Sequence, residues 1–214
     1  MSLRSIISLS LLFGVGSLQA IVLTLSGDVD ISIANDFDGT YLSFTDLGDA
    51  TQYSVSSSDP DPASWDINPF FGGAAVATSD TFVPVLSSTA TNSDLLNLAF
   101  GTTVGPSSDF PSGFSGSTGH MDDGIGPVDP LKFETSTSGY IGFALVDGSD
   151  HYYGWMEMTL NDDGTAGTIH QWAWNTVANE AITVGMVPEP ASAAMLVGLG
   201  AMLWVGSRRC ARAV

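Results

Sequence analysis

Hydrophobic and polar residues alternate in short runs along much of the chain, and the clearest runs lie in its last third. Apolar and aromatic side chains recur there at every second position, and clusters of Asn, Asp, Ser and Gly separate the runs. A period of two with frequent turn residues is typical of short β-strands. We therefore expect five consecutive strands, at residues 132–135, 139–146, 152–160, 167–175 and 181–184.

The earlier part of the chain is less regular. Residues 21–25 and 29–33 alternate in the same way around a Gly-Asp pair, and short apolar islands follow at 74–77 and 82–86. We expect one helical turn at residues 93–100, with Ser93 or Asn92 as the N-capping residue.

Residues 105–130 are rich in Gly and Pro and predict a long loop. Short strands, frequent turns and almost no helix indicate a mainly β fold, and we expect an antiparallel β-sandwich or a jelly-roll-like domain. No internal repeat of fixed period is visible, which disfavours a propeller or a solenoid. The stretch from 21 to 186 is long enough for one domain with a real hydrophobic core.

This predicted domain is strongly acidic. Of 23 acidic residues only Glu189 lies outside residues 21–187, and of five basic residues only Lys132 lies inside them, which leaves 22 acids and one base, a formal charge of −21. Repulsion excludes nucleic acid and anionic membrane surfaces as partners, whereas divalent cations and neutral polysaccharides are compatible. The single cysteine is Cys210, so the domain forms no disulfide and must be stabilised by packing.

The N-terminus has the pattern of an export signal. Arg4 precedes an apolar run, and a short segment that ends in the small residue Ala20 follows it. We expect a signal helix over residues 1–20 that is removed after Ala20. Because Leu18 departs from the small residue usual at its position, cleavage after Ser17 is the alternative.

The C-terminus carries a second address signal. A Val-Pro-Glu-Pro motif at 187–190 precedes an uncharged apolar run at 191–206 and a basic tail at 207–214. We expect the run to form a transmembrane helix about 24 Å long, which is short for the roughly 30 Å hydrocarbon core and predicts local thinning or a transient stay. The arginines of the tail hold the C-terminus in the cytoplasm, so the domain lies outside.

These C-terminal features resemble the PEP-CTERM sorting signal of Gram-negative bacteria. The resemblance implies transient residence in the inner membrane, cleavage near the motif by an exosortase, and release or transfer to the cell surface, often alongside exopolysaccharide production. A plain tail anchor is the alternative. The residues that the exosortase would read are Pro188, Glu189, Pro190, Arg208 and Arg209.

The last third also resembles the β-sandwich domains of other PEP-CTERM proteins. The resemblance adds no catalytic residue and supports a surface β-sandwich. The matching segments are Gly139-Tyr140-Ile141-Gly142-Phe143, Tyr153-Gly154-Trp155 and Trp172-Ala173-Trp174.

Aromatic side chains in the predicted last sheet are candidates for glycan binding, because flat rings can stack on sugar rings. Tyr153 and Trp155 share one strand face, and so do Trp172 and Trp174, so one of these pairs is also explained as core. The residues considered for a lectin-like glycan-binding module are Tyr152, Trp155, Trp172 and Trp174.

Acidic turns offer a candidate calcium site, since Ca²⁺ takes six to eight oxygen ligands. The residues considered for this site are Asp147, Asp150, Asp162 and Asp163. Asp and Gly are also the default residues of turns, which explains the same clusters without a metal.

No nucleophile elbow and no zinc-site spacing occurs in the sequence, so we expect no enzyme. A carboxylate pair such as Glu134 with Glu157 leaves a secreted glycan-active hydrolase as an alternative. The sequence therefore predicts an exported cell-surface or extracellular-matrix protein with a structural or exopolysaccharide-associated role.

Overall fold

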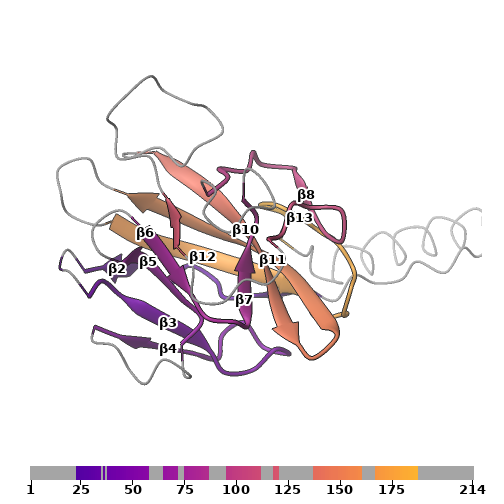
Figure 1. The fold of residues 1–214 in the computed structure, drawn as a ribbon, viewed down its shortest axis with the longest axis horizontal. Coiled ribbons are helices and arrows are strands. Elements are labelled where there is room, and N and C mark those ends of the chain that lie inside the picture. Colours follow the sequence, from indigo (N-terminus) through magenta and orange to yellow (C-terminus); the bar gives the residue numbers. More distant parts are fainter. Residues whose placement is uncertain are drawn as a thin grey trace, which may run out of the picture.

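The computed structural model describes residues 23–34, 36, 38–57, 65–71, 75–86, 95–111, 118–120, 137–160 and 167–187. These residues contain β-strands and no α-helix, and all their strand pairings are antiparallel, which confirms the mainly β class (Figure 1). The predicted signal helix and, apart from Val187, the predicted sorting motif, helix and tail lie outside them. Within the described ranges, no helix is long and apolar enough to cross a membrane.

The largest sheet, here called the central sheet, has the strand order β1-β12-β11-β10-β7, and β2 also pairs with β12. Its strands are β1 (Leu23–Leu25), β2 (Ile31–Ile33), β7 (Phe82–Pro84), β10 (Ser138–Asp147), β11 (Asp150–Leu160) and β12 (Gly167–Asn175).

The second sheet has the order β4-β3-β5-β6-β9, and a small third sheet pairs β13 with β8. The strands of the second sheet are β3 (Tyr41–Phe44), β4 (Tyr53–Ser56), β5 (Ile67–Phe71), β6 (Ala75–Thr78) and β9 (Thr118–His120). Those of the small sheet are β8 (Thr103–Val104) and β13 (Ile182–Thr183).

β1 and β2 pair with consecutive parts of β12 rather than with each other. Leu23 lies opposite Asn175, and Ile31 lies opposite Ile169. Between the two strands the chain passes through the left-handed region at Gly27, whose φ is 74°. Because glycine has no Cβ, it adopts this conformation without strain. The two short strands therefore act together as one interrupted edge strand.

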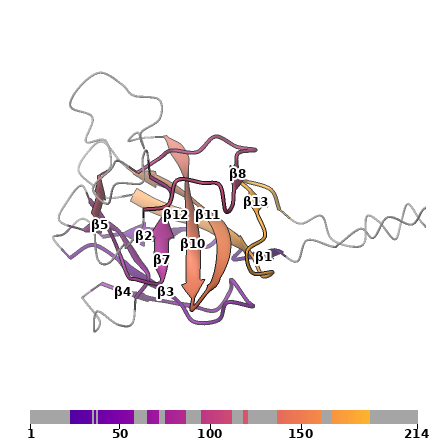
Figure 2. The ribbon, with the colours of Figure 1, turned by 45° about the vertical axis from the view of Figure 1, so that its right-hand side comes forward.

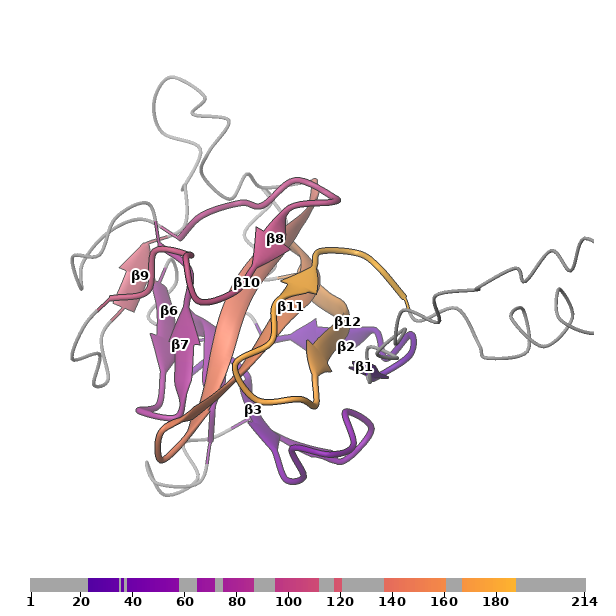
Figure 3. The ribbon, with the colours of Figure 1, turned by 90° about the vertical axis from the view of Figure 1, so that its right-hand side faces the viewer.

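The central sheet is covered on both faces. Phe143 and Leu145 of β10 pack in the main core, together with apolar side chains of the second sheet, whereas Ala144 between them packs in a second core. Val104 and Ile182 of the small sheet contribute to this second core. Figures 2 and 3 show β8 and β13 close to β10 and β11. Both faces of the central sheet are buried, which explains why its strands in the last third carry apolar side chains on both faces.

Phe44 of β3 joins the two larger sheets through aromatic contacts. Its ring centroid lies 5.3 Å from that of Trp172 and 5.2 Å from that of Trp174, both edge-on. It also stacks at 6.2 Å on Phe82 and on Phe143. Such pairs contribute about 0.5–1.5 kcal/mol each beyond the area they bury.

The observed strands of the last third begin and end close to their predicted bounds. Residues 167–175 form β12 as predicted, 139–146 and 152–160 become β10 and β11 with two residues added to each, and 181–184 shortens to β13. The strand predicted at 132–135 lies outside the described residues.

Two predictions for the middle of the chain are wrong in the described part. The expected helical turn at 93–100 is absent over residues 95–100, where Leu95 bridges to Leu86 and Leu98 bridges to Tyr140. Strand pairing with residues far along the chain overrides the local N-cap signal. The predicted loop at 105–130 contains β9, which pairs with β6.

The buried indoles differ in their hydrogen bonds. The indole N–H of Trp172 donates to the carbonyl oxygen of Ala50 at 3.1 Å, and that of Trp174 donates to the carbonyl oxygen of Leu47 at 2.7 Å. The buried indole N–H of Trp155 has no hydrogen-bond partner among the described residues. The indoles of Trp172 and Trp174 therefore fix the loop after β3 against the central sheet. The indole of Trp155 contributes to packing alone.

We expect Trp174→Phe to lower the free energy of unfolding by about 1–3 kcal/mol more than Trp155→Phe does. Both substitutions remove similar volume from a fully buried site, but only Trp174→Phe leaves a carbonyl oxygen without its donor. Urea unfolding monitored by circular dichroism, with m-values compared, measures the difference. Equal losses in the two variants would contradict the assignment.

Candidate functional site

The β10–β11 hairpin has a hollow on each side of its tip. Asp147 pairs with Asp150, and Gly148, with φ 61°, is the first of the two loop residues, as a type II′ turn requires. The turn before β7 lies beside this tip, and the backbone N–H of Val146 donates to the carbonyl oxygen of Thr81 at 2.8 Å. Val146 lines both hollows.

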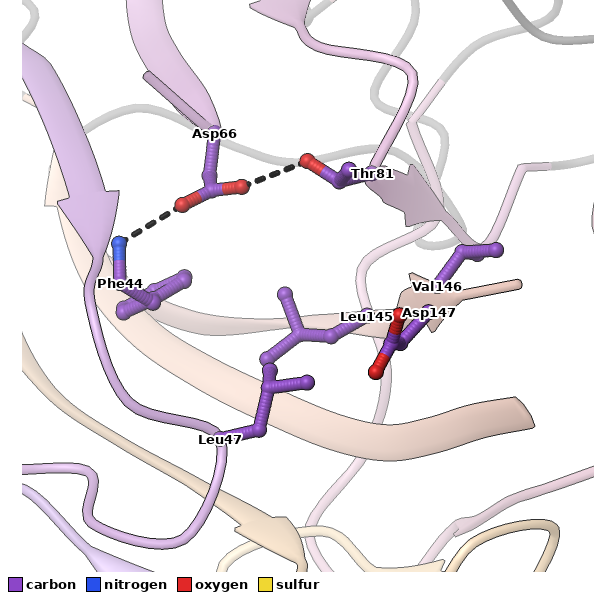
Figure 4. A pocket seen from close by; sticks show the side chains of 7 residues that line it. All are labelled: Phe44, Leu47, Asp66, Thr81, Leu145, Val146 and Asp147. Carbon is purple, nitrogen blue, oxygen red and sulfur yellow. Dashed lines mark hydrogen bonds between the residues drawn. The ribbon is translucent and has the colours of Figure 1, made fainter. Parts of the chain in front are cut away.

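The inner hollow lies on the side of the main core and has a volume of about 240 Å³. Figure 4 shows Asp66, which precedes β5, on one side and Asp147, at the end of β10, on the other. Its lining residues are Phe44, Leu47, Asp66, Thr81, Leu145, Val146 and Asp147.

Asp66 is held at the wall of the inner hollow by hydrogen bonds to both carboxylate oxygens. The backbone N–H of Phe44 donates to Oδ2 at 2.7 Å, and the hydroxyl of Thr81 donates to Oδ1 at 2.8 Å (Figure 4). Burial raises the pKa of Asp66, and the hydrogen bonds from Phe44, Thr81 and Ser79 oppose that rise. The carboxyl therefore links β3, the start of β5 and the turn before β7.

The outer hollow lies on the other face of the central sheet and has a volume of about 500 Å³. Tyr153 and His151 project from β11, Ser108 and Phe110 come from the segment after β8, and Asp80 comes from the turn before β7. Three segments far apart in the sequence thus meet at this hollow.

Three rings form a nearly parallel row at the outer hollow. Phe110 and Tyr153 have centroids 5.6 Å apart with an interplanar angle of 25°, and His151 and Tyr153 have centroids 6.2 Å apart with an angle of 16°. Tyr153 is only 5% exposed, whereas His151 and Phe110 are half-buried. Burial raises the pKa of the Tyr153 phenol, which is neutral at physiological pH.

The predicted glycan-binding aromatics do not form an exposed surface, which corrects the prediction. Trp155, Trp172 and Trp174 are each 0% exposed, and Tyr152 is half-buried against the main core. Both strand faces of the aromatic segments are core because the central sheet is covered on both sides. The three indoles therefore have no face on which a sugar ring could stack.

Sequence reasoning missed the row of rings at the outer hollow. Tyr153 shares a strand face with Trp155, and the sequence leaves open whether this pair or the pair Trp172 and Trp174 is core. Phe110 lies in the segment predicted as loop. The alternation around His151 and Tyr153 was a usable signal for a shared face, but nothing in the sequence places Phe110 beside them.

The structure describes two of the four residues considered for the calcium site. Asp147 and Asp150 are exposed at the hairpin tip, and Asp162 and Asp163 lie outside the described residues. Within the part of the chain that the structure describes, no group of three or more His, Cys, Asp or Glu side chains is arranged to hold a metal ion. The calcium site stays a prediction.

The carboxylate pair considered for hydrolysis is described at one position only. Glu134 lies outside the described residues, and Glu157 accepts hydrogen bonds from Ser138 Oγ and Gln171 Nε2, both at 2.7 Å. These contacts are cross-strand links on β10, β11 and β12.

A carboxylate, an imidazole and a hydroxyl also lie in line at the far edge of the central sheet. His170 Nδ1 is 2.9 Å from Asp30 Oδ1, and His170 Nε2 is 2.9 Å from Thr159 Oγ1. This order occurs in hydrolase triads, but neither hollow is lined by these residues. The three side chains tie the residue before β2 to β12 and β11.

Comparison with protein-family models, curated proteins and solved structures gives no match. The resemblance to PEP-CTERM proteins therefore depends on the residues quoted for it, and Pro188, Glu189, Pro190, Arg208 and Arg209 lie outside the described residues.

We expect Asp66→Asn to remove a pH dependence of stability. A raised pKa means that the folded state favours the protonated carboxyl, so the stability it contributes is complete below the ordinary value of 3.8 and is lost as the pH rises through the raised value. An Asn amide keeps both contacts in neutral form, because its oxygen accepts from Phe44 and its N–H donates to Thr81. The variant should gain stability relative to wild type as the pH rises from acid to neutral.

Asp49 provides a control of opposite sign for this experiment. Hydrogen bonds from Thr51, its side chain first and its backbone second, lower the pKa of this exposed carboxyl. The stability that Asp49 contributes is present above 3.8 and is lost as the pH falls, so Asp49→Asn should lose stability relative to wild type as the pH rises. Urea unfolding of both variants from acid to neutral pH measures the two trends, and trends of the same sign would contradict the assignment of Asp66.

Proposed function

We propose that this chain is an exported β-sandwich protein of a bacterial cell surface or extracellular matrix, sorted and cut by an exosortase, with a structural or exopolysaccharide-associated role. The sandwich is supported by the main core, to which the central and second sheets both contribute side chains. Sorting is supported by the C-terminal motif and by the export signal at the N-terminus.

The observation that carries this proposal is where the packed core ends. Val184 is 0% exposed, whereas Met186 and Val187 are 50% and 48% exposed. Among the described residues the buried core therefore ends before Pro188, and cleavage near the motif removes no buried residue of this part. At the other end β1 begins at Leu23, after the predicted cleavage at Ala20.

The chemistry of the chain agrees with a role outside the cytoplasm. Its net charge of −18 keeps it soluble and away from nucleic acid and anionic lipid. The described domain contains no cysteine, so it needs no disulfide in any compartment, and this feature neither favours nor opposes export. A transient stay in the inner membrane through residues 191–206 belongs to the same proposal.

We further propose that the domain is not an enzyme. Asp66 and Asp147 line the inner hollow, and one of them has a raised pKa, as the acid of a glycoside hydrolase does. The hollow of about 240 Å³ is smaller than the roughly 300–1,000 Å³ of ligand pockets. Both oxygens of Asp66 are hydrogen-bonded to groups of the fold. A structural link between strands explains this carboxyl better than proton donation to a substrate.

The sorting proposal predicts the mass of the mature protein. Protein recovered from the cell surface or medium should end near residues 187–191 in a strain with the exosortase, and should run to Val214 in a strain without it. Replacing Pro188 and Glu189 by Ala should give the long form in both strains, and Glu180→Gln, an exposed acid of the domain, should be cut as the wild type is. Intact-mass spectrometry reads all forms, and a chain that runs to Val214 in every strain would refute the proposal.

The absence of hydrolysis is tested with neutral polysaccharides. We expect the purified chain to release no reducing ends above the level of a heat-denatured sample. Asp147 is exposed, so Asp147→Asn folds normally and serves as the control for a carboxylate pair. Release by the wild type that falls at least about a hundredfold in Asp147→Asn would show that the inner hollow is catalytic.

A further inference from the structure

We infer that the outer hollow binds one neutral pyranose ring of a glycan, with the ring stacked on His151 or Phe110. The inference rests on the proposed function in one respect only: that the glycan is an exopolysaccharide outside the cell. Binding by the purified chain is measured without any exosortase, so this inference and the sorting proposal fail independently.

The size of the outer hollow is the first argument. Its volume of about 500 Å³ falls within the roughly 300–1,000 Å³ typical of sites for small molecules, and the inner hollow falls below that range. The lining combines the apolar surfaces of Val83, Val146 and Phe110 with polar groups from the segments around it. A ligand with one apolar face and a polar rim fits such a lining.

The row of rings is the second argument. Because Tyr153 is 5% exposed and is stacked with both neighbours, the exposed ring area left for a ligand belongs to His151 and to Phe110, which is half-buried and also packs against the second core. Cages that hold quaternary ammonium groups surround the cation with several rings. A nearly parallel row instead presents flat faces, which suit the C–H face of a pyranose.

Polar groups at the hollow can reach sugar hydroxyls. The Ser108 hydroxyl accepts the backbone N–H of Gly105 at 3.1 Å, which fixes the oxygen and leaves its proton to donate. The carboxylate of Asp80 and the imidazole of His151 have no side-chain hydrogen-bond partner among the described residues, so both are available to vicinal hydroxyls.

The backbone around the hollow is fixed before a ligand arrives. The backbone N–H of Ser108 donates to Gly105 and that of Phe110 donates to Ser108, each at 2.9 Å. On the other side Asn179, with φ 63°, donates its N–H to the carbonyl oxygen of His151 at 2.7 Å and accepts the N–H of His151 through Oδ1 at 3.3 Å. A preorganised site loses less entropy on binding.

Charge selects a neutral sugar over an acidic one. Asp80 lines the hollow, and Asp147 and Asp150 are exposed at the adjoining hairpin tip. A uronic acid would bring a carboxylate close to these groups, on a chain whose net charge is −18. We therefore expect hexopyranosides to bind and hexuronosides to be rejected.

The test is saturation-transfer NMR on the purified full-length chain in a detergent without sugar. The probes are the methyl pyranosides of glucose, galactose and mannose, with methyl glucuronoside as the acidic counterpart and tetramethylammonium as the cation. We expect at least one neutral pyranoside to bind. Phe110→Leu and His151→Ala should each weaken its affinity by about tenfold or more.

Matched control variants distinguish a loss of binding at the outer hollow from a general effect of substitution on the protein. Phe100→Leu changes an aromatic that is 66% exposed and does not line the hollow, and Tyr152→Phe changes the neighbour that faces the main core. Asp28→Asn changes an exposed acid near β1, at the opposite edge of the central sheet from β7, and shows whether the loss of one surface charge alone changes the affinity. All three controls should keep wild-type affinity, and circular dichroism melts confirm that each variant is folded.

Three results would overturn the inference. One is that no neutral pyranoside binds to the wild type. Another is that a pyranoside binds but Phe110→Leu and His151→Ala, shown to be folded, keep wild-type affinity. The third is that tetramethylammonium or the glucuronoside binds more tightly than every neutral sugar.

Discussion

The aromatic contacts of Phe44 hold the two larger sheets together, and much of the rest of the structure depends on them. Its ring touches Trp172 and Trp174 of β12, and its backbone N–H donates to Asp66. The same residue thus joins the sheets through its side chain and anchors the half-buried carboxyl of Asp66 through its main chain. In a domain without a disulfide, such packing supplies the stability that cross-links supply in many exported proteins. These contacts support the proposal that the inner hollow, which Phe44 lines, is part of the fold rather than a site for chemistry.

Burial of the central sheet on both faces decides where a ligand can bind. Trp172 and Trp174 fill the face toward the second sheet, and Trp155 and Ala173 fill the face toward the small sheet. Along β10, β11 and β12 the middle of the sheet is therefore closed to ligands. The outer hollow lies toward the hairpin tip, where the segment after β8 covers the end of the sheet. A ligand at the end of the hairpin would not require either core to open, so a binding site there costs the domain no folding stability.

The sequence predicts the last third of the fold well because turn residues and aromatic alternation both mark the strand ends. β12 matches its predicted range, and the Asp-Gly-Ser-Asp turn marks the hairpin between β10 and β11. Alternation alone does not say whether one face or both faces of a strand are covered, and for this reason four aromatics are candidates for glycan binding in the sequence although three of them are fully buried. The bridges of Leu95 and Leu98 depend on partners far along the chain, which local signals do not encode. The same limit applies to Phe110, whose place beside Tyr153 follows from tertiary packing.

The acidity of the chain is partly a structural property, and this shapes the ligand that the outer hollow would take. The backbone N–H of Gly39 donates to Asp36 at 2.7 Å, and that of Gly48 donates to Asp46 at 2.7 Å, so these carboxylates close their own turns. A carboxylate used in this way does not need a cation to explain its presence. The charge nevertheless remains on the surface, since the turns leave it exposed, and its field acts on any approaching molecule. At the outer hollow itself the acids are Asp80 and, at the adjoining hairpin tip, the exposed Asp147 and Asp150, so an anion would be repelled from the proposed sugar site before any specific hydrogen bond forms.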